Sequence, residues 1–212
     1  MRLPAMLAAL FLTSCSPWTI RPIDDGSQAQ AQGLDPAAYA SSIWSSRLLP
    51  SLIKSASDAR TLIDALKVSV DSAGQTYGHR EGSGAWYFVT RGKGVVLAEH
   101  ATSRVRTVDV DIAPFDRKPD LSLEIGPVLR GTSVRDATGL VPFTNFTTQL
   151  QYADVGNALN DIVLKSVLEP VTAAPMEGRT VDFIATFSAE AGWQPPVRDA
   201  IPVQFKLEGA QP

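Results

Sequence analysis

The order of alternating and helical segments is the feature that most constrains the fold of this chain. Polar and apolar residues alternate in three segments, a long helical segment follows, and two more alternating segments come last. Alternation with a period of two predicts half-buried strands, and apolar residues every three to four positions predict an amphipathic helix. The predicted strands are 85–97, 107–112, 121–125, 180–187 and 203–208, and the predicted helix is 145–169, ended by Pro170.

This order is that of an OB-fold, a five-stranded Greek-key barrel with a helix between its third and fourth strands. Gly92 and Gly94 interrupt the first strand, which predicts one strand bent sharply at a barrel corner. Gly156 weakens the helix, so we expect a break near it. The predicted class is α+β, with an OB-like β-barrel over residues 85–208. The alternative is an open antiparallel sheet with helices on one face.

Two short amphipathic helices are predicted ahead of the strands, over residues 35–73. An aspartate N-cap followed by Pro36 marks the start of the first helix, which we expect to end at Pro50. Ser57 opens the second helix, whose apolar stripe reaches Val70. Because both helices are short, each must pack against another part of the protein.

The N-terminus carries the pattern of a bacterial lipoprotein signal. Arg2 supplies the positive region, the apolar run AMLAALFL follows, and the tetrapeptide LTSC ends at Cys15, the single cysteine. The apolar run is much shorter than the roughly 20 residues that a membrane-spanning helix needs. We therefore expect residues 1–14 to be a cleaved signal peptide and Cys15 to be acylated. The alternative, an incidental cysteine, leaves the order of these features unexplained.

The expected lipid anchor at Cys15 makes the membrane a partner and places the protein in the periplasm. Residues 15–34 are rich in Pro, Gln, Ser, Gly and Ala, a composition typical of a flexible tether. Ser16 stands where an aspartate would favour the inner membrane, so we expect the outer membrane. The net charge of −3 makes nucleic acid a poor partner. With Cys15 acylated, no thiol remains for a disulfide or a metal site.

Three stretches carry a resemblance to a known family. They are TIRPID at Thr19–Asp24, GKGV at Gly92–Val95, and IGPVLRGTSVRDATG at Ile125–Gly139, the last continuing through Phe143, Phe146, Gln149, Tyr152, Ala153 and Asn160. The chain resembles, to about Leu207, a family of predicted periplasmic lipoproteins of unknown function. The resemblance implies a secreted, lipid-anchored protein. Since family members are often encoded near sugar ABC transporters, it also implies an accessory role in solute uptake. It carries no catalytic or binding residue over to this chain.

The segment after the third predicted strand is the best candidate for a ligand or partner site. Its polar residues are Arg130, Thr132, Arg135 and Asp136, and Asn145 and Gln149 follow. Guanidinium groups match carboxylates and phosphates, and amides add neutral polar contacts, so the segment would suit a small anion, a sugar acid or an acidic tail of a partner. The alternative is structural: an arginine pairs with an acidic neighbour, and the amides cap the helix.

The remaining candidate residues give weaker signals. Trp193 lies in the predicted loop beside the usual ligand face of an OB barrel, as either an exposed contact or a lid on the core. In the aromatic run 86–88, alternate members are expected to fill the barrel core and one to face a neighbouring helix, the alternative being an exposed surface that stacks on bases or sugar rings. His79 and His100 are the only histidines and have no clustered third ligand, so no metal is predicted. The chain has no phosphate loop, dinucleotide fingerprint or nucleophile elbow, so neither a cofactor nor an enzyme activity is predicted.

Three functions are compatible with these observations. The leading hypothesis is a non-enzymatic, lipid-anchored periplasmic protein that serves as an accessory or scaffold for a sugar transport system. The second is a lipoprotein that binds a sugar or a small anion through Arg130, Arg135, Asn145 and Gln149. A hydrolase of the envelope is the third and has the least support, because no catalytic set is assembled in the sequence.

Overall fold

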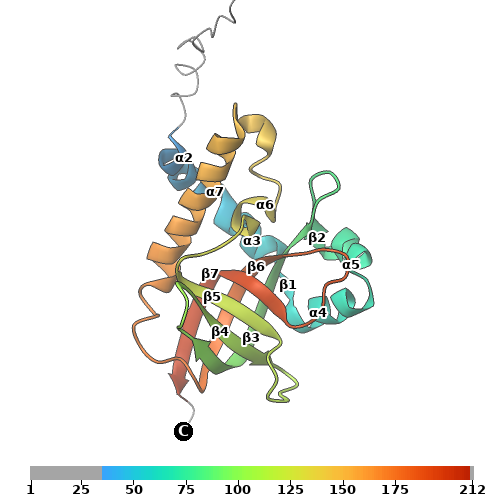
Figure 1. Ribbon diagram of the computed structural model, residues 1–212, viewed down its shortest axis with the longest axis vertical. Coiled ribbons are helices and arrows are strands. Elements are labelled where there is room, and N and C mark those ends of the chain that lie inside the picture. The colour runs from blue at the N-terminus through green and yellow to red at the C-terminus, as the bar shows by residue number, and fades with distance from the viewer. Residues whose placement is uncertain (1–34, 211–212) are drawn as a thin grey trace, which may run out of the picture. The chain divides into compact units, whose positions relative to one another are not determined.

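The computed structural model describes residues 35–210, which contain helices packed on a β-barrel (Figure 1). The expected signal peptide 1–14 and the expected tether 15–34, with Cys15, lie outside the described residues. Within the described range, no helix combines the length and the apolar character needed to cross a membrane.

Five strands form a closed barrel in the predicted chain order. They are β3 (Trp86–His100), β4 (Val105–Ile112), β5 (Leu121–Pro127), β6 (Arg179–Ala189) and β7 (Val197–Ala210). The order around the barrel is β3-β4-β5-β7-β6, and pairing between β6 and β3 closes it. Only β5 and β7 run parallel in this ring. Two short strands, β1 (Ser57–Asp58) and β2 (Gly78–His79), pair with the first half of β3. The closed ring rules out the open sheet.

The predicted corner in the first strand is confirmed at Gly94. This residue is in register with Val181 of β6 and also with Ile112 of β4, so β3 passes here from one neighbour to the other. A Cβ atom on Gly94 would lie 2.5 Å from the carbonyl oxygen of Asp111. Only glycine therefore allows the two strands to approach this closely.

The first helical segment is longer than predicted. It runs from α2 (Pro36–Ile43) through a π-helical turn (Trp44–Leu48) into α3 (Leu49–Ser55). The predicted end at Pro50 is wrong, because Pro50 lies in the first turn of α3, where its missing N–H costs little. Asp35 caps α2 as expected, and its side chain accepts hydrogen bonds from two backbone N–H groups.

The second predicted helix is two helices, α4 (Ala59–Val68) and α5 (Val70–Tyr77), with extended backbone at Ser69 between them. Asp58, rather than Ser57, is the N-cap of α4. The helices end at Tyr77, beyond the expected limit of 73. Trp86 of β3 packs so closely on Gly74 of α5 that a Cβ atom there would lie 2.2 Å from the indole ring.

The helix between the third and fourth barrel strands is present but begins later than predicted. A short 3-10 turn (Phe143–Asn145) precedes α7 (Gln149–Val163), and a π-helical turn (Leu164–Leu168) follows it. The helix continues through Gly156, so the predicted break there is wrong. The reason for a glycine at this position is packing, because the side chain of Arg135 lies against it.

One continuous core joins the barrel to the helices. Its largest fully buried side chains include Phe88, Phe183 and Phe187 of the barrel, Leu62 and Ile63 of α4, and Leu159 of α7. Of the aromatic run 86–88, Phe88 is fully buried in the core and Trp86 faces the neighbouring helix α5. Trp86 and Tyr87 are half-buried against the outside of the core, and Tyr87 is therefore available to line a pocket.

Candidate functional site

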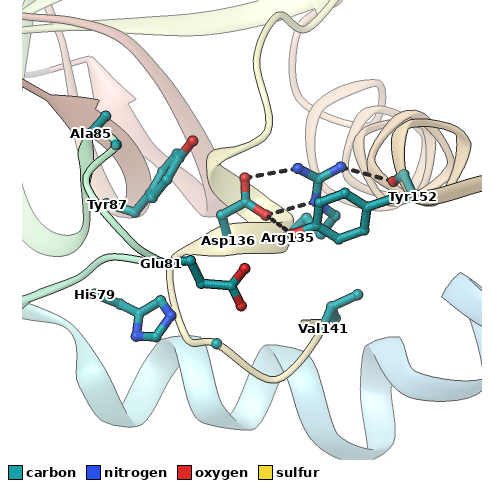
Figure 2. A pocket seen from close by; sticks show the side chains of 10 residues that line it. His79, Glu81, Ala85, Tyr87, Arg135, Asp136, Val141 and Tyr152 are labelled. Atoms are coloured by element: carbon teal, nitrogen blue, oxygen red, sulfur yellow. Dashed lines mark hydrogen bonds and ion pairs between the residues drawn. The ribbon is translucent and has the colours of Figure 1, made fainter. Parts of the chain in front are cut away.

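A pocket of about 220 Å³ lies beside the short helix α6 (Ser133–Asp136), which follows β5. It is lined by His79 of β2, Glu81 of the β2–β3 connection, Tyr87 of β3, Arg135 and Asp136 of α6, Val141 after α6, and Tyr152 of α7 (Figure 2). Pockets for drug-sized ligands measure about 300–1,000 Å³. This pocket therefore suits a small molecule.

Arg135, Asp136 and Tyr152 satisfy one another's polar groups. The guanidinium of Arg135 binds both carboxylate oxygens of Asp136, with Nε–Oδ1 at 2.6 Å and Nη2–Oδ2 at 2.9 Å. Its remaining nitrogen, Nη1, donates to the carbonyl oxygen of Tyr152 at 2.8 Å. The Tyr152 hydroxyl donates to Asp136 Oδ1 at 2.9 Å, and Arg135 Cζ lies 3.4 Å from the centroid of the Tyr152 ring. Each nitrogen of Arg135 thus makes one hydrogen bond within this group, which uses three of the five N–H donors of the guanidinium.

The same three residues are held in low-dielectric surroundings. Arg135 is only 6% exposed, and a Cβ atom at Gly156 would lie 3.3 Å from its Nη1 atom. Burial raises the pKa of the Tyr152 hydroxyl above its ordinary value of 10.0, and the negative charge of Asp136 raises it further. Tyr152 therefore keeps its proton at neutral pH and acts as a hydrogen-bond donor, not as a base.

The other side of the pocket has a buried histidine nitrogen and the exposed carboxylate of Glu81. Nε2 of His79 is buried without a hydrogen-bond partner, and its ring packs against Gly139, where a Cβ atom would lie 2.6 Å away. The side chain of Glu81 projects into the pocket (Figure 2) and has no partner among the described residues. Arg135 contributes one positive charge, and Glu81 and Asp136 one negative charge each, so the lining has a net charge of −1 when His79 is neutral.

Arg130 forms a separate cluster outside this pocket. Its Nη2 atom lies 2.6 Å from Asp199 Oδ1, and its backbone N–H donates to Glu124 Oε2 at 2.6 Å. The side chain of Glu124 is fully buried, and this burial raises its pKa, while the hydrogen bond from Arg130 opposes the rise. The nearby charge of Asp199 raises the pKa of Arg130. Arg130 thus covers a buried carboxylate and does not join Arg135 in one anion site.

The other predicted site residues lie apart from one another. Thr132 borders a neighbouring pocket with Arg130, on the other side of Tyr87. Asn145 and Gln149 are exposed and line neither of these two pockets. Trp193 is half-buried against the core. In the part of the chain that the structure describes, no group of three or more His, Cys, Asp or Glu side chains could hold a metal ion.

Comparison with known proteins decides the family. Residues 5–206 match the sequence profile of the family described as predicted periplasmic lipoprotein (DUF2291). This chain belongs to that family. The match covers nearly the whole chain and supports a lipid-anchored protein of the periplasm; the family description names no catalytic activity. No curated protein matches this lipoprotein.

A solved structure confirms the fold of the lipoprotein. The chain is similar to an OB-fold protein from Thermotoga maritima whose crystal structure is known, with a TM-score of 0.70 and 23% sequence identity. The match covers 84% of this lipoprotein and the whole of that chain. The predicted OB-like barrel is therefore confirmed, and at this level of identity the likeness concerns the fold alone.

Two of the ten residues that line the pocket of this lipoprotein were predicted from the sequence as site residues. Arg135 and Asp136 were predicted as site residues, whereas Glu81 and Tyr87 were not, and His79 was considered only as a metal ligand. The missed residues lie in or beside the polar, glycine-rich connection 78–84, which is recognisable in the sequence. Its position opposite α6 depends on tertiary packing between segments more than fifty residues apart.

Proposed function

We propose that this lipoprotein is a non-enzymatic, ligand-binding protein that serves solute transport at the envelope. The observation that carries the proposal is the pocket at Arg135. In this pocket the paired side chains of Arg135 and Asp136 lie opposite the carboxylate of Glu81, which has no protein partner among the described residues. Such a pocket has hydrogen-bond acceptors to offer and a net negative charge. It favours a small ligand rich in hydrogen-bond donors, neutral or positively charged, such as a polyol or an amine.

The charge distribution argues against the alternative of a small anion or a sugar acid. The guanidinium of Arg135 has its three nitrogens bound to Asp136 and Tyr152. An incoming carboxylate would have to displace Asp136, or share the guanidinium with Asp136 and lie in the same pocket as Glu81. Either choice places like charges together in a partly buried site, which is unfavourable.

The geometry also gives no support to a hydrolase. The hydroxyl of Tyr152 is committed to Asp136, and the raised pKa of this hydroxyl prevents it from serving as a nucleophile near neutral pH. Asp136 accepts hydrogen bonds from two partners and is not free to act as a general base.

The experiment that tests ligand binding is a thermal-shift screen of the full chain. The screen compares sugars and other polyols, organic amines, and organic anions at equal concentration. A ligand at one hundred times its Kd would stabilise the protein by about 2.7 kcal/mol. We expect stabilisation by a polyol or an amine, and we expect Glu81→Gln to abolish it. Glu177→Gln, which alters an exposed carboxylate elsewhere, is the matched control. Stabilisation by anions that survives Glu81→Gln would overturn the proposal.

The role in transport has a separate test. Its support is the lipid anchor and the accessory role in solute uptake that the family resemblance implies. We expect the acylated protein, captured from detergent-solubilised envelopes, to retain subunits of a solute transporter. Capture of the protein alone, without any transport subunit, would leave ligand binding as the function and remove the accessory role.

A further inference from the structure

Two segments at one end of the described domain contain no charged residue, although Asp35 at the start of α2 and Asp154 of α7 flank them. Residues 137–153 form seventeen consecutive positions without Lys, Arg, Asp or Glu, although these four charged residue types make up 19% of the chain. Residues 36–46, which include α2, are equally without charge. The two segments meet in space, because the ring of Tyr39 on α2 lies 5.5 Å from the ring of Phe146.

This end of the domain is built around a cluster of aromatic rings. Tyr152 lies between Phe143 and Phe146, with ring centroids 5.4 and 5.3 Å away. Phe143 is 40% exposed, and Leu150 in the first turn of α7 is 71% exposed. These residues, Tyr39, Phe143, Phe146, Leu150 and Tyr152, are called the aromatic end below. It thus combines rings packed on the core with two apolar side chains that project from it.

The aromatic end is also where the chain enters the domain. In Figure 1 the start of α2 and the first turn of α7 lie at one end, and the β4–β5 loop lies at the other. Asp35, the N-cap of α2, stands twenty residues after Cys15. A segment of this length spans at most about 70 Å, even when fully extended. An acyl group on Cys15 would therefore hold the start of α2 within about 70 Å of the bilayer.

We propose that the aromatic end docks on the lipid bilayer, with Leu150 and Phe143 inserted at the interface. Aromatic and apolar side chains among uncharged polar groups suit the boundary between lipid headgroups and acyl chains. Two projecting side chains are few for a stable protein interface, which buries about 800 Å² on each partner. They are enough to orient a domain that an anchor already holds at the membrane, because tethering makes the second contact intramolecular.

This inference extends the proposed function without depending on it, since it concerns the orientation of the domain and not its ligand. Val141 and Tyr152 belong to the uncharged segment and also line the pocket at Arg135. Docking would therefore hold that pocket beside the membrane surface, with the β4–β5 loop directed away from it.

Spin labelling of the full-length acylated protein in phosphatidylcholine vesicles tests the docking. Because Cys15 is the only cysteine and is blocked by acylation, an introduced cysteine is the single free thiol. A label at Thr147→Cys reports on the aromatic end, and a label at Lys118→Cys reports on the β4–β5 loop; both positions are exposed. We expect the label at 147 to become more accessible to oxygen than to a water-soluble nickel chelate, and the label at 118 to remain in water.

The variants connect this signal to the named side chains. With the label at 147, Leu150→Ser should lower the ratio of docked to undocked protein by about tenfold, which corresponds to about 1.4 kcal/mol. Phe115→Ser removes an exposed Phe of the β4–β5 loop and should leave the ratio unchanged. Both positions are on the surface, so unchanged melting temperatures would verify folding.

Two outcomes would overturn the proposal. One is a label at 147 that remains as accessible to the nickel chelate as the label at 118. The other is shielding of position 147 that occurs in native envelope membranes but not in the lipid vesicles, because the occupant would then be a protein. A ligand shift in the screen described above would be compatible with either outcome, so the two proposals fail independently.

Discussion

Arg135 and Asp136 are adjacent in the chain, and their side chains form a two-pronged ion pair, with Nε–Oδ1 at 2.6 Å and Nη2–Oδ2 at 2.9 Å. Tyr152 closes this pair from α7 through its hydroxyl and its carbonyl oxygen. The three residues thereby join α6 to α7 at the wall of the pocket. Their role as a structural support for the pocket can be measured.

Arg135→Met should lower the free energy of unfolding by about 3–5 kcal/mol, because the carboxylate of Asp136 would lose its partner in a buried site. The double variant Arg135→Met/Asp136→Asn should cost less than the sum of the single changes. Urea denaturation measures both. Lys67→Met, which breaks an exposed pair with Asp64, is the control and should cost no more than about 1 kcal/mol. Equal losses in Lys67→Met and Arg135→Met would contradict this role.

Tyr152→Phe should change the response to alkaline pH. The pKa of Tyr152 is raised in the folded protein, so the stability that its protonated hydroxyl contributes is complete below pH 10.0 and is lost as the pH rises above that value. Tyr152→Phe should be less stable than the natural protein at pH 8, by about 1.5–3 kcal/mol for a hydrogen bond to a charged group. The difference should shrink above pH 10. Denaturation midpoints over this pH range test the prediction, and a difference that grows with pH would refute it.

Gly139→Ala should be more destabilising than Gly131→Ala. Both glycines have left-handed backbone, with φ of 66° and 82°, so each substitution should cost about 1–2 kcal/mol of backbone strain. Gly131 has open space around it, whereas a Cβ atom at Gly139 would lie 2.6 Å from the ring of His79. The additional loss in Gly139→Ala measures the packing of that ring. Equal unfolding free energies for the two variants would show that the ring moves away without cost.

Asp58→Ala should remove the N-cap of α4 and cost about 1 kcal/mol at neutral pH. Hydrogen bonds from the backbone N–H and the hydroxyl of Thr61 lower the pKa of Asp58 below its ordinary value of 3.8. The contribution of the carboxylate is therefore present above pH 3.8 and is lost as the pH falls further. Asp58→Asn keeps a capping side chain and should cost less. Thermal denaturation at pH 7 and pH 3 checks the prediction, which requires the loss in Asp58→Ala to be smaller at pH 3.

The barrel could be predicted from the sequence because its signals are local. Alternation marks each strand, and glycine in the first strand marks the corner at Gly94. Rules based on the local sequence gave wrong predictions at two positions where tertiary packing determines the residue. Pro50 is a helix stop by its own chemistry but occupies the first turn of α3, and Gly156 is a helix breaker by propensity but leaves room for Arg135.

The candidate site was predictable only in part, for the same reason. The pairing of Arg135 with a neighbouring carboxylate was foreseen as the structural alternative, and it is what the structure contains. The position of Glu81 opposite that pair depends on how the β2–β3 connection folds over the barrel, which no residue pattern near Glu81 indicates. The contributions of these site residues to ligand binding remain predictions.

The position of β7 between β5 and β6 has a consequence for how the chain acquires its structure. The last barrel strand in the sequence is the one that joins two walls of the barrel, in parallel with β5 and antiparallel to β6. Until Val197–Ala210 is available, β5 and β6 each keep an unpaired edge, and such edges recruit other strands. The barrel can therefore close only when β7 is present, and a chain cut short before Val197 would be prone to aggregate.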